Sequence, residues 1–262
     1  MGELWFVGVG LSDENDLSRR AWELLGRCGA LFAEEHTSRL AAGSLERLSA
    51  ALGRSVTTLS RSELESETPI REALARHERV ALLVAGDPFV ATTHVALRLS
   101  VESWGHRWGY LPNATVVTAV PGFLGLMQYR FGRTVSLPFP APGFTPRSPL
   151  EHVARNRVAG LHTLVLLDLR PEEGRYLTAN AAISLLTERD DRLPRTLAPE
   201  LELAVVARVG RADAQAWVGR ASQLLPIDFG PPLHSLVVPA PELHFLEQEA
   251  WERWRRPYPS SA

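Results

Sequence analysis

A polar turn directly after an apolar run is the first place in this sequence where chemistry is expected. Residues 82–94 (LLVAGDPFVATTH) pass from a strand-like segment into Gly86, Asp87 and Pro88, and then toward a helix that we expect to begin near Ala91. In open α/β sheets, ligands collect at the carboxyl ends of the strands, where a carboxylate can meet a hydroxyl or cationic group. Asp87 is therefore a candidate ligand-binding residue. The competing interpretation is a helix cap, a role that suits aspartate equally well.

A glycine-rich turn, VGVGL at residues 7–11, follows the first strand-like run. Its spacing resembles the start of a dinucleotide-binding fingerprint, but the third glycine of that pattern would fall on Asp13 and the next helix starts late. A glycine turn without any ligand remains the simpler interpretation. The hypothesis that the protein is a nicotinamide-dependent oxidoreductase would rest on this turn alone.

Two other motif interpretations fail. A kinase-type DFG at residues 228–230 lacks a preceding HRD-type loop and a strand lysine. The histidines never occur at zinc-ligand spacing on one helix, and no Cys/His cluster is present, so we predict no metal site. His94 has no neighbouring nucleophile to activate, so packing is the simpler role for it.

Composition narrows the function further. The chain has 262 residues, is 45% apolar and 22% charged, and carries a net charge of -2, which gives no basic footprint for nucleic acid. Lysine is absent, so every fixed cation is an arginine and amine-based Schiff-base chemistry is excluded. Cys28 is the lone cysteine, and neither a signal peptide nor a membrane-spanning run is visible. We expect a cytoplasmic protein.

Short β-branched runs alternate with segments of helical period, which predicts parallel α/β architecture. In the first part of the chain we expect strands at 4–9, 30–33, 55–59 and 80–84, and helices from Ser18, at 44–52 and at 70–77. We place a domain boundary near Pro112. After it we expect a helix, followed by strands at 134–137, 163–169, 203–209 and 235–238. The domains are thus expected at 1–112 and 113–262. We expect a surface loop over the proline-rich residues 137–149 and a helix over 241–256.

The ordered set of segments, from about Leu4 to about Trp251, resembles the diphthine synthases, a branch of the tetrapyrrole methylase-like methyltransferases. The segments that carry the resemblance are GVGLSDENDLS, AEEHTS, GDPFVATTH, PNATVVTAV followed by QYRFG, GLHTLVLLDL, YLTANAA, ARVG and DFGPPLHSLVVP. The resemblance implies two α/β domains of the tetrapyrrole methylase type with a cofactor cleft between them, and usually a homodimer.

The resemblance also implies S-adenosylmethionine as cofactor, with S-adenosylhomocysteine as product. Its contacts map by motif position onto Leu11, Asp87, Val90, Thr115, Val116, Leu167, Val209 and His234. Most of these are apolar, which suits backbone groups that hold the cofactor and side chains that shape a dry pocket. We predict that Asp87→Ala abolishes cofactor binding with the fold intact, and unchanged affinity in calorimetry would refute this.

The implied reaction is repeated methylation of the amino group of a 3-amino-3-carboxypropyl-histidine on translation elongation factor 2, in diphthamide biosynthesis. An activated sulfonium requires alignment of an uncharged amine and exclusion of water. The sequence names no catalytic base; His94 and His234 are conceivable proton acceptors, each better explained by packing. Alternatives are a tetrapyrrole or rRNA methyltransferase of the same superfamily, against which GLHTL, YLTANAA and DFGPPLHSL argue, and a cofactor-binding regulator without turnover.

Overall fold

The computed structural model describes residues 1–34, 38–141, 147–187 and 200–255. The chain divides into two compact units, Met1–Val116 and Val117–Ala262, so the boundary proposed at Pro112 lies shortly before the division. Each unit is built on its own five-stranded sheet. The units are described separately.

The sheet of the first unit is parallel throughout, with the strand order β3-β2-β4-β1-β5. Its strands are β1 (Glu3–Gly10), β2 (Ala30–Glu34), β3 (Thr57–Leu59), β4 (Arg79–Ala85) and β5 (Arg107–Leu111). The helices are α1 (Arg19–Leu25), α2 (Ser44–Leu52), α3 (Arg61–Ser66), α4 (Thr68–Arg76) and α5 (His94–Ser103), with the short 3-10 helix η1 (Glu14–Asp16).

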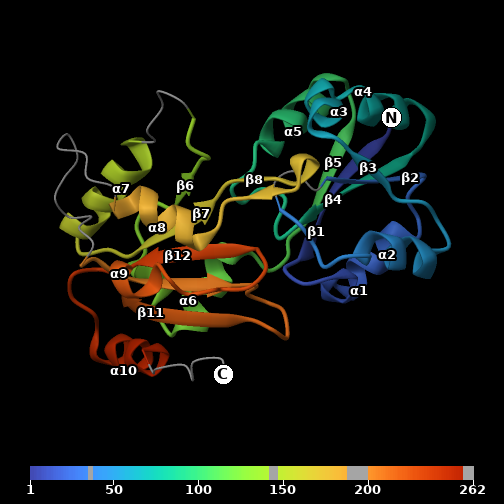
Figure 1. The fold of residues 1–262 in the computed structure, drawn as a ribbon. Coiled ribbons are helices and arrows are strands. Elements are labelled where there is room, and N and C mark those ends of the chain that lie inside the picture. Colours follow the sequence, from blue (N-terminus) through green and yellow to red (C-terminus); the bar gives the residue numbers. More distant parts are fainter. Residues whose placement is uncertain (35–37, 142–146, 188–199, 256–262) are drawn as a thin grey trace. The chain divides into compact units, whose positions relative to one another are not determined.

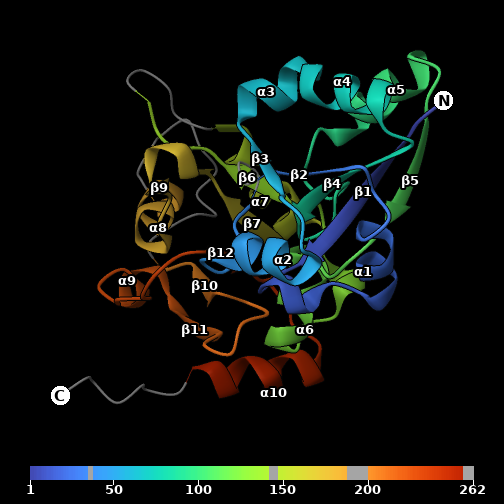
Figure 2. The ribbon, with the colours of Figure 1, turned by 90° about the vertical axis from the view of Figure 1, so that its right-hand side faces the viewer.

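Helices cover both faces of this sheet, because both faces of its strands are apolar. Leu4 and Phe6 belong to a buried cluster with residues of α3, α4 and α5. Val7 and Val9 point to the opposite face and pack with residues of α1 and α2. Figure 1 shows the two helix groups on either side of the strands, and Figure 2 shows the same arrangement from another direction.

The structure adds one strand to this unit and moves the start of one helix. The stretch before Pro112 contains β5, for which no strand was expected; Gly109 is needed there because a Cβ would lie 2.6 Å from the ring of Trp5. The helix expected near Ala91 begins at His94, since Ala91 has a φ of 57°, a left-handed conformation that interrupts a helix.

The second unit has a mixed sheet with the order β11-β10-β12-β7-β6. Only β6 and β7 are parallel; the other neighbouring strands in it are antiparallel. Its strands are β6 (Val135–Leu137), β7 (Thr163–Leu167), β10 (Glu202–Ala207), β11 (Gln215–Arg220) and β12 (His234–Val238), with a separate hairpin of β8 (Leu169–Arg170) and β9 (Arg175–Tyr176). The helices are α6 (Val116–Leu124), α7 (Arg147–Val158), α8 (Ala179–Thr187), α9 (Ala221–Leu224) and α10 (Phe245–Trp254), with the 3-10 helices η2 (Gln128–Arg130) and η3 (Pro171–Glu173).

The largest buried cluster of this unit joins one face of the sheet to α7, α8 and α9. On the sequence side, β11 was not expected, and the single strand expected at 163–169 breaks at Asp168. Of the loop expected at 137–149, residues 142–146 lie outside the described residues, while Pro149 belongs to α7. The helix expected from Pro241 begins only at Phe245, where the ring of His244 caps it by accepting a hydrogen bond from the Leu246 amide.

None of the helices in the described ranges is long and apolar enough to cross a membrane.

Candidate functional site

The glycine turn and the GDP loop meet at the carboxyl ends of β1 and β4. The amide of Gly86 donates to the carbonyl of Gly10 over 2.7 Å, and the amide of Gly10 donates back to Gly86 over 3.3 Å. Gly10 and Gly86 both have positive φ, 97° and 74°, which glycine adopts without steric cost. The two turns are therefore fixed against each other.

The side chain of Asp16 stabilises the glycine turn by accepting hydrogen bonds from its backbone amides. One oxygen of its carboxylate accepts the amides of Leu11, at 3.0 Å, and Ser12, at 2.7 Å. A Cβ on Gly10 would lie 2.5 Å from the Asp16 side chain, so the turn requires glycine. The amides that would hold a pyrophosphate in a dinucleotide-binding turn are thus occupied by the protein's own carboxylate, which argues against the oxidoreductase interpretation.

The buried carboxylate of Asp87 holds the GDP loop to the end of β5. It accepts the Phe89 amide at 2.9 Å, the Tyr110 hydroxyl at 2.5 Å and the Asn113 amide at 3.4 Å. Burial, together with this carboxylate, raises the pKa of Tyr110. The helix-cap alternative is wrong, because the cap position of α5 is Thr93.

Asn113 connects the third segment to the other two. Its side-chain amide donates to the carbonyls of Gly8 and Asp16, both at 3.0 Å, while its backbone amide reaches Asp87. The half-buried Thr115 and Val116 follow directly. The first unit thereby collects five of the proposed contact residues at one sheet edge: Leu11, Asp87, Val90, Thr115 and Val116.

His94 supports the same loop. Its buried ring places Nδ1 2.7 Å from the carbonyl of Pro88, and Nε2 lies 3.9 Å from a carboxylate oxygen of Glu34. The hydroxyl of Thr92 also donates to Pro88, over 2.5 Å. These contacts assign His94 and Thr92 to holding the loop, and for His94 this agrees with the packing role expected from the sequence.

The second unit brings the other three residues to one edge of its sheet. β12 runs antiparallel to both β10 and β7, so its first residues meet the last residues of those strands: His234 pairs with Ala207, and Ser235 with Leu166. Leu167 ends β7, and Val209 lies just beyond β10. Both are half-buried.

The buried imidazole of His234 has one satisfied nitrogen. Nδ1 lies 3.3 Å from the amide of Ala179, the first residue of α8, and must accept that hydrogen bond. Nε2 therefore carries the proton, and within the described residues it makes no hydrogen bond of normal geometry, although the backbone carbonyls of Pro231 and Gly230 lie near enough to favour the protonated ring. Burial, and then the charge of Arg208, lowers the pKa of this imidazole and keeps it neutral.

The described residues contain no group of three or more His, Cys, Asp or Glu side chains placed to hold a metal ion.

Residues 3–225 match the family of tetrapyrrole (corrin/porphyrin) methylases. The chain is 39% identical over 248 residues to the diphthine synthase of Methanothermobacter thermautotrophicus, and the aligned region covers 94% of this chain and 93% of the relative. The chain belongs to the diphthine synthase family. The corresponding protein of Methanosphaerula palustris is 41% identical, over 95% and 97% of the two chains. A crystal structure of a diphthine synthase superposes with a TM-score of 0.87 at 34% identity, over 97% of this chain and 96% of the other.

Membership in the family confirms the predicted α/β methylase fold and makes the chain a methyltransferase. The side chains that organise the two edges were not singled out from the sequence. Asp16, Asn113 and Arg208 lie inside signature segments, and Tyr110 lies in the unexpected strand β5. The sequence feature that could have identified such residues is a polar side chain next to a proposed apolar contact, as Arg208 is next to Val209.

Proposed function

We propose that this protein is an S-adenosylmethionine-dependent diphthine synthase. It methylates the amino group of the 3-amino-3-carboxypropyl-histidine of translation elongation factor 2, acts in the cytoplasm and forms a homodimer. The observation that carries the proposal is identity of 39% and 41% to diphthine synthases over nearly the whole length of both chains. No second superfamily activity has comparable support, since the relatives compared above carry the same name.

The residues at the two sheet edges fit the cofactor. Leu11, Val90, Leu167 and Val209 offer apolar side chains at the carboxyl ends of strands or in the turns just beyond them, and His234 offers a buried N–H that makes no hydrogen bond of normal geometry within the described chain. Leaving a buried donor unpaired costs about 1–3 kcal/mol, so a ligand acceptor there is favourable. We propose that these residues, with Asp87, Thr115 and Val116, hold S-adenosylmethionine.

S-adenosylmethionine, when bound, supplies a methyl group on a sulfonium that is already an activated electrophile. The chain then has to orient the acceptor amine and keep water away, and no covalent nucleophile is needed. His234 is unsuited as a base, because its Nδ1 lone pair faces the Ala179 amide and its Nε2 is protonated. A protonated amine cannot attack, and with His234 excluded we propose that the amine loses its proton to solvent before transfer.

Methylation assays test the proposal directly. The protein is incubated with isotopically labelled S-adenosylmethionine and either elongation factor 2 carrying the 3-amino-3-carboxypropyl-histidine or uroporphyrinogen. Mass spectrometry of the elongation-factor loop should show added methyl groups on the amino nitrogen, and it also reports their number. Label in uroporphyrinogen alone would establish the tetrapyrrole alternative. Tight binding of the intact donor without methylation of either acceptor would favour the regulator.

A further inference from the structure

Arg208 is a buried arginine at the edge of the second sheet. It follows β10, its side chain is 7% exposed, and its φ of 55° is left-handed, which is uncommon for a residue with a Cβ. Burying a guanidinium is costly unless its donors are all satisfied, and a left-handed arginine adds strain. A residue that is kept here despite both costs is a candidate for a positioning role.

The guanidinium ties the turn after β10 to the loop before β12. It donates to the carboxylate of Asp213 over 2.6 Å, and to the carbonyls of Phe229 and Pro231 over 3.0 and 2.6 Å. The Arg208 amide donates to the carbonyl of Leu233 over 2.8 Å. A planar fork is required to reach a carboxylate and two carbonyls at once, so lysine cannot replace it.

This loop leads directly into His234, and its packing leaves it little freedom. The ring of Phe229 is buried and meets the rings of Trp217 and His234 edge-on, at centroid distances of 5.0 and 6.1 Å. Gly230 has a positive φ, and a Cβ there would already touch the guanidinium at 3.4 Å. The orientation of the imidazole is thereby coupled to Arg208.

The charge of Arg208 acts on the same ring. Among the described residues, the charge of Arg208 lowers the pKa of His234, while the charge of Asp228 and the carbonyls of Pro231 and Gly230 raise it; α8 and the rest of β12 contain only uncharged residues. A neutral ring with its lone pair on Nδ1 can accept the Ala179 amide and present the Nε2 proton, whereas a protonated ring would oppose that amide with a second proton.

We propose that Arg208 is a positioning residue of the cofactor site, which fixes the Val209 turn and the 228–233 loop so that the Nε2 proton of His234 faces S-adenosylmethionine. This inference rests on the proposed function. Arg208 contacts the chain's own carbonyls and would act on the cofactor only through the neighbouring residues of the turn and the loop.

Calorimetry with S-adenosylhomocysteine on the full-length protein tests the role. Arg208→Met should weaken binding by about tenfold or more, the loss expected when a charge-assisted network is removed. Arg208→Lys keeps the charge and should still weaken binding several-fold. The matched control is Arg157→Met: Arg157 donates to the carbonyl of Pro239 over 2.8 Å just beyond the opposite end of β12, so its loss affects stability and not affinity.

A second measurement requires no ligand. In histidine NMR titrations of the free protein, the His234 ring should titrate below the ordinary pKa of about 6.5 in the wild type and in Arg157→Met, and closer to that ordinary pKa in Arg208→Met. Wild-type affinity in both Arg208 variants, or an unchanged His234 titration in Arg208→Met, overturns the inference and leaves the proposed function intact. Absence of binding by the wild type overturns both.

Discussion

Glu247 on α10 is the most consequential buried charge outside the site. Its side chain is fully buried, and its carboxylate accepts the amides of Met127 and His244 at 2.9 and 3.0 Å and the Nε2 proton of His162 at 3.1 Å. It also forms an ion pair with Arg130. The network therefore joins the QYRFG and GLHTL segments to the C-terminal helix, which lies against β11 (Figure 1).

We expect Glu247→Gln to lower the free energy of unfolding of this unit by about 3 kcal/mol. Removing one member of a buried pair costs about 3–5 kcal/mol because the other charge is left uncompensated. Arg130 is 24% exposed, so water can reach it and the lower end applies. Arg130→Met leaves the fully buried carboxylate and should cost about 5 kcal/mol. Glu247→Leu combined with Arg130→Met removes both charges and should cost less than Arg130→Met alone.

The loss of stability expected for Glu247→Gln depends on pH. Burial alone would raise the pKa of Glu247, but the amides of Met127 and His244 and the His162 ring outweigh it, so the pKa lies below the ordinary 4.5. A carboxyl with a lowered pKa stabilises the folded state fully above its unfolded pKa, and that contribution is lost as the pH falls through the folded value. The difference between wild type and Glu247→Gln is thus greatest at neutral pH and narrows in acid.

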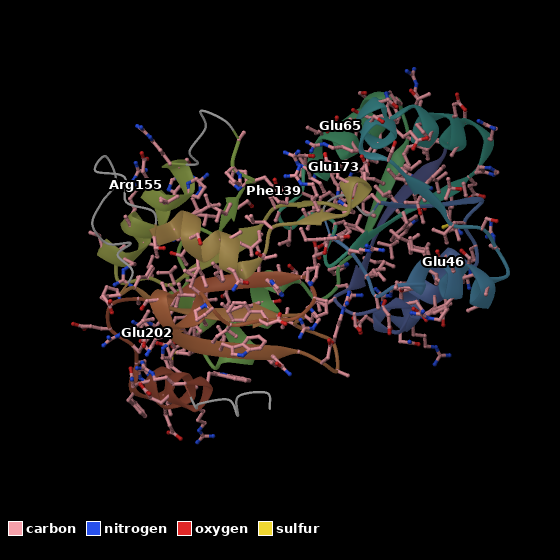
Figure 3. The ribbon with its side chains drawn as sticks, viewed as in Figure 1. Glu46, Glu65, Phe139, Arg155, Glu173 and Glu202 are labelled. Carbon is pink, nitrogen blue, oxygen red and sulfur yellow. The ribbon has the colours of Figure 1, made fainter. Side chains whose placement is uncertain are left out.

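Urea denaturation followed by tryptophan fluorescence measures these differences. Trp251, buried one turn further along α10, donates its indole N–H to Glu202 over 3.3 Å; Figure 3 labels Glu202 beside this helix. Glu249→Gln is the control on the same helix, since its exposed pair with Arg253 contributes only about 0–1 kcal/mol. Equal denaturation midpoints for Glu247→Gln and Glu249→Gln at neutral pH would refute the reasoning.

The other predictions concern the first unit. Asp87→Ala and Asn113→Ala each remove hydrogen bonds that hold a loop with proposed contacts. Calorimetry should therefore show at least about tenfold weaker binding of S-adenosylhomocysteine, with the circular dichroism spectrum unchanged. Wild-type affinity in either variant would show that the loop keeps its conformation without that side chain. Glu14 has its pKa lowered from 4.5 to about 2 by hydrogen bonds from Arg47, so its contribution is present above pH 4.5 and lost toward pH 2. Glu14→Gln should therefore destabilise at pH 7 and match the wild type near pH 2, and a pH-independent difference would contradict this assignment.

Strands that form nearly continuous apolar runs, such as β1 and β4, were predictable from the sequence, whereas β5, β9 and β11 were not. Trp108 and Gly109 in β5 look like loop residues, because the reason for the glycine is the ring of Trp5 on a distant part of the chain. The same limit applies to the site. Val90 and Leu167 are ordinary apolar residues, so only the family resemblance proposes them as contacts, and the sheet register that gathers such residues is not encoded locally.

The polar residues of both sheet edges bind the protein's own backbone. Asp16, Asp87, Asn113 and Arg208 each hold amides or carbonyls of the turns that carry the proposed contacts, and those contacts themselves are mostly apolar. This division suits transfer from an activated donor, where rigid placement contributes more than acid–base chemistry. It also agrees with the lack of a nucleophile–base pair among the sequence motifs. At these edges the polar side chains fix loops, and among the described residues the buried Nε2 proton of His234 is the donor that we propose meets a ligand.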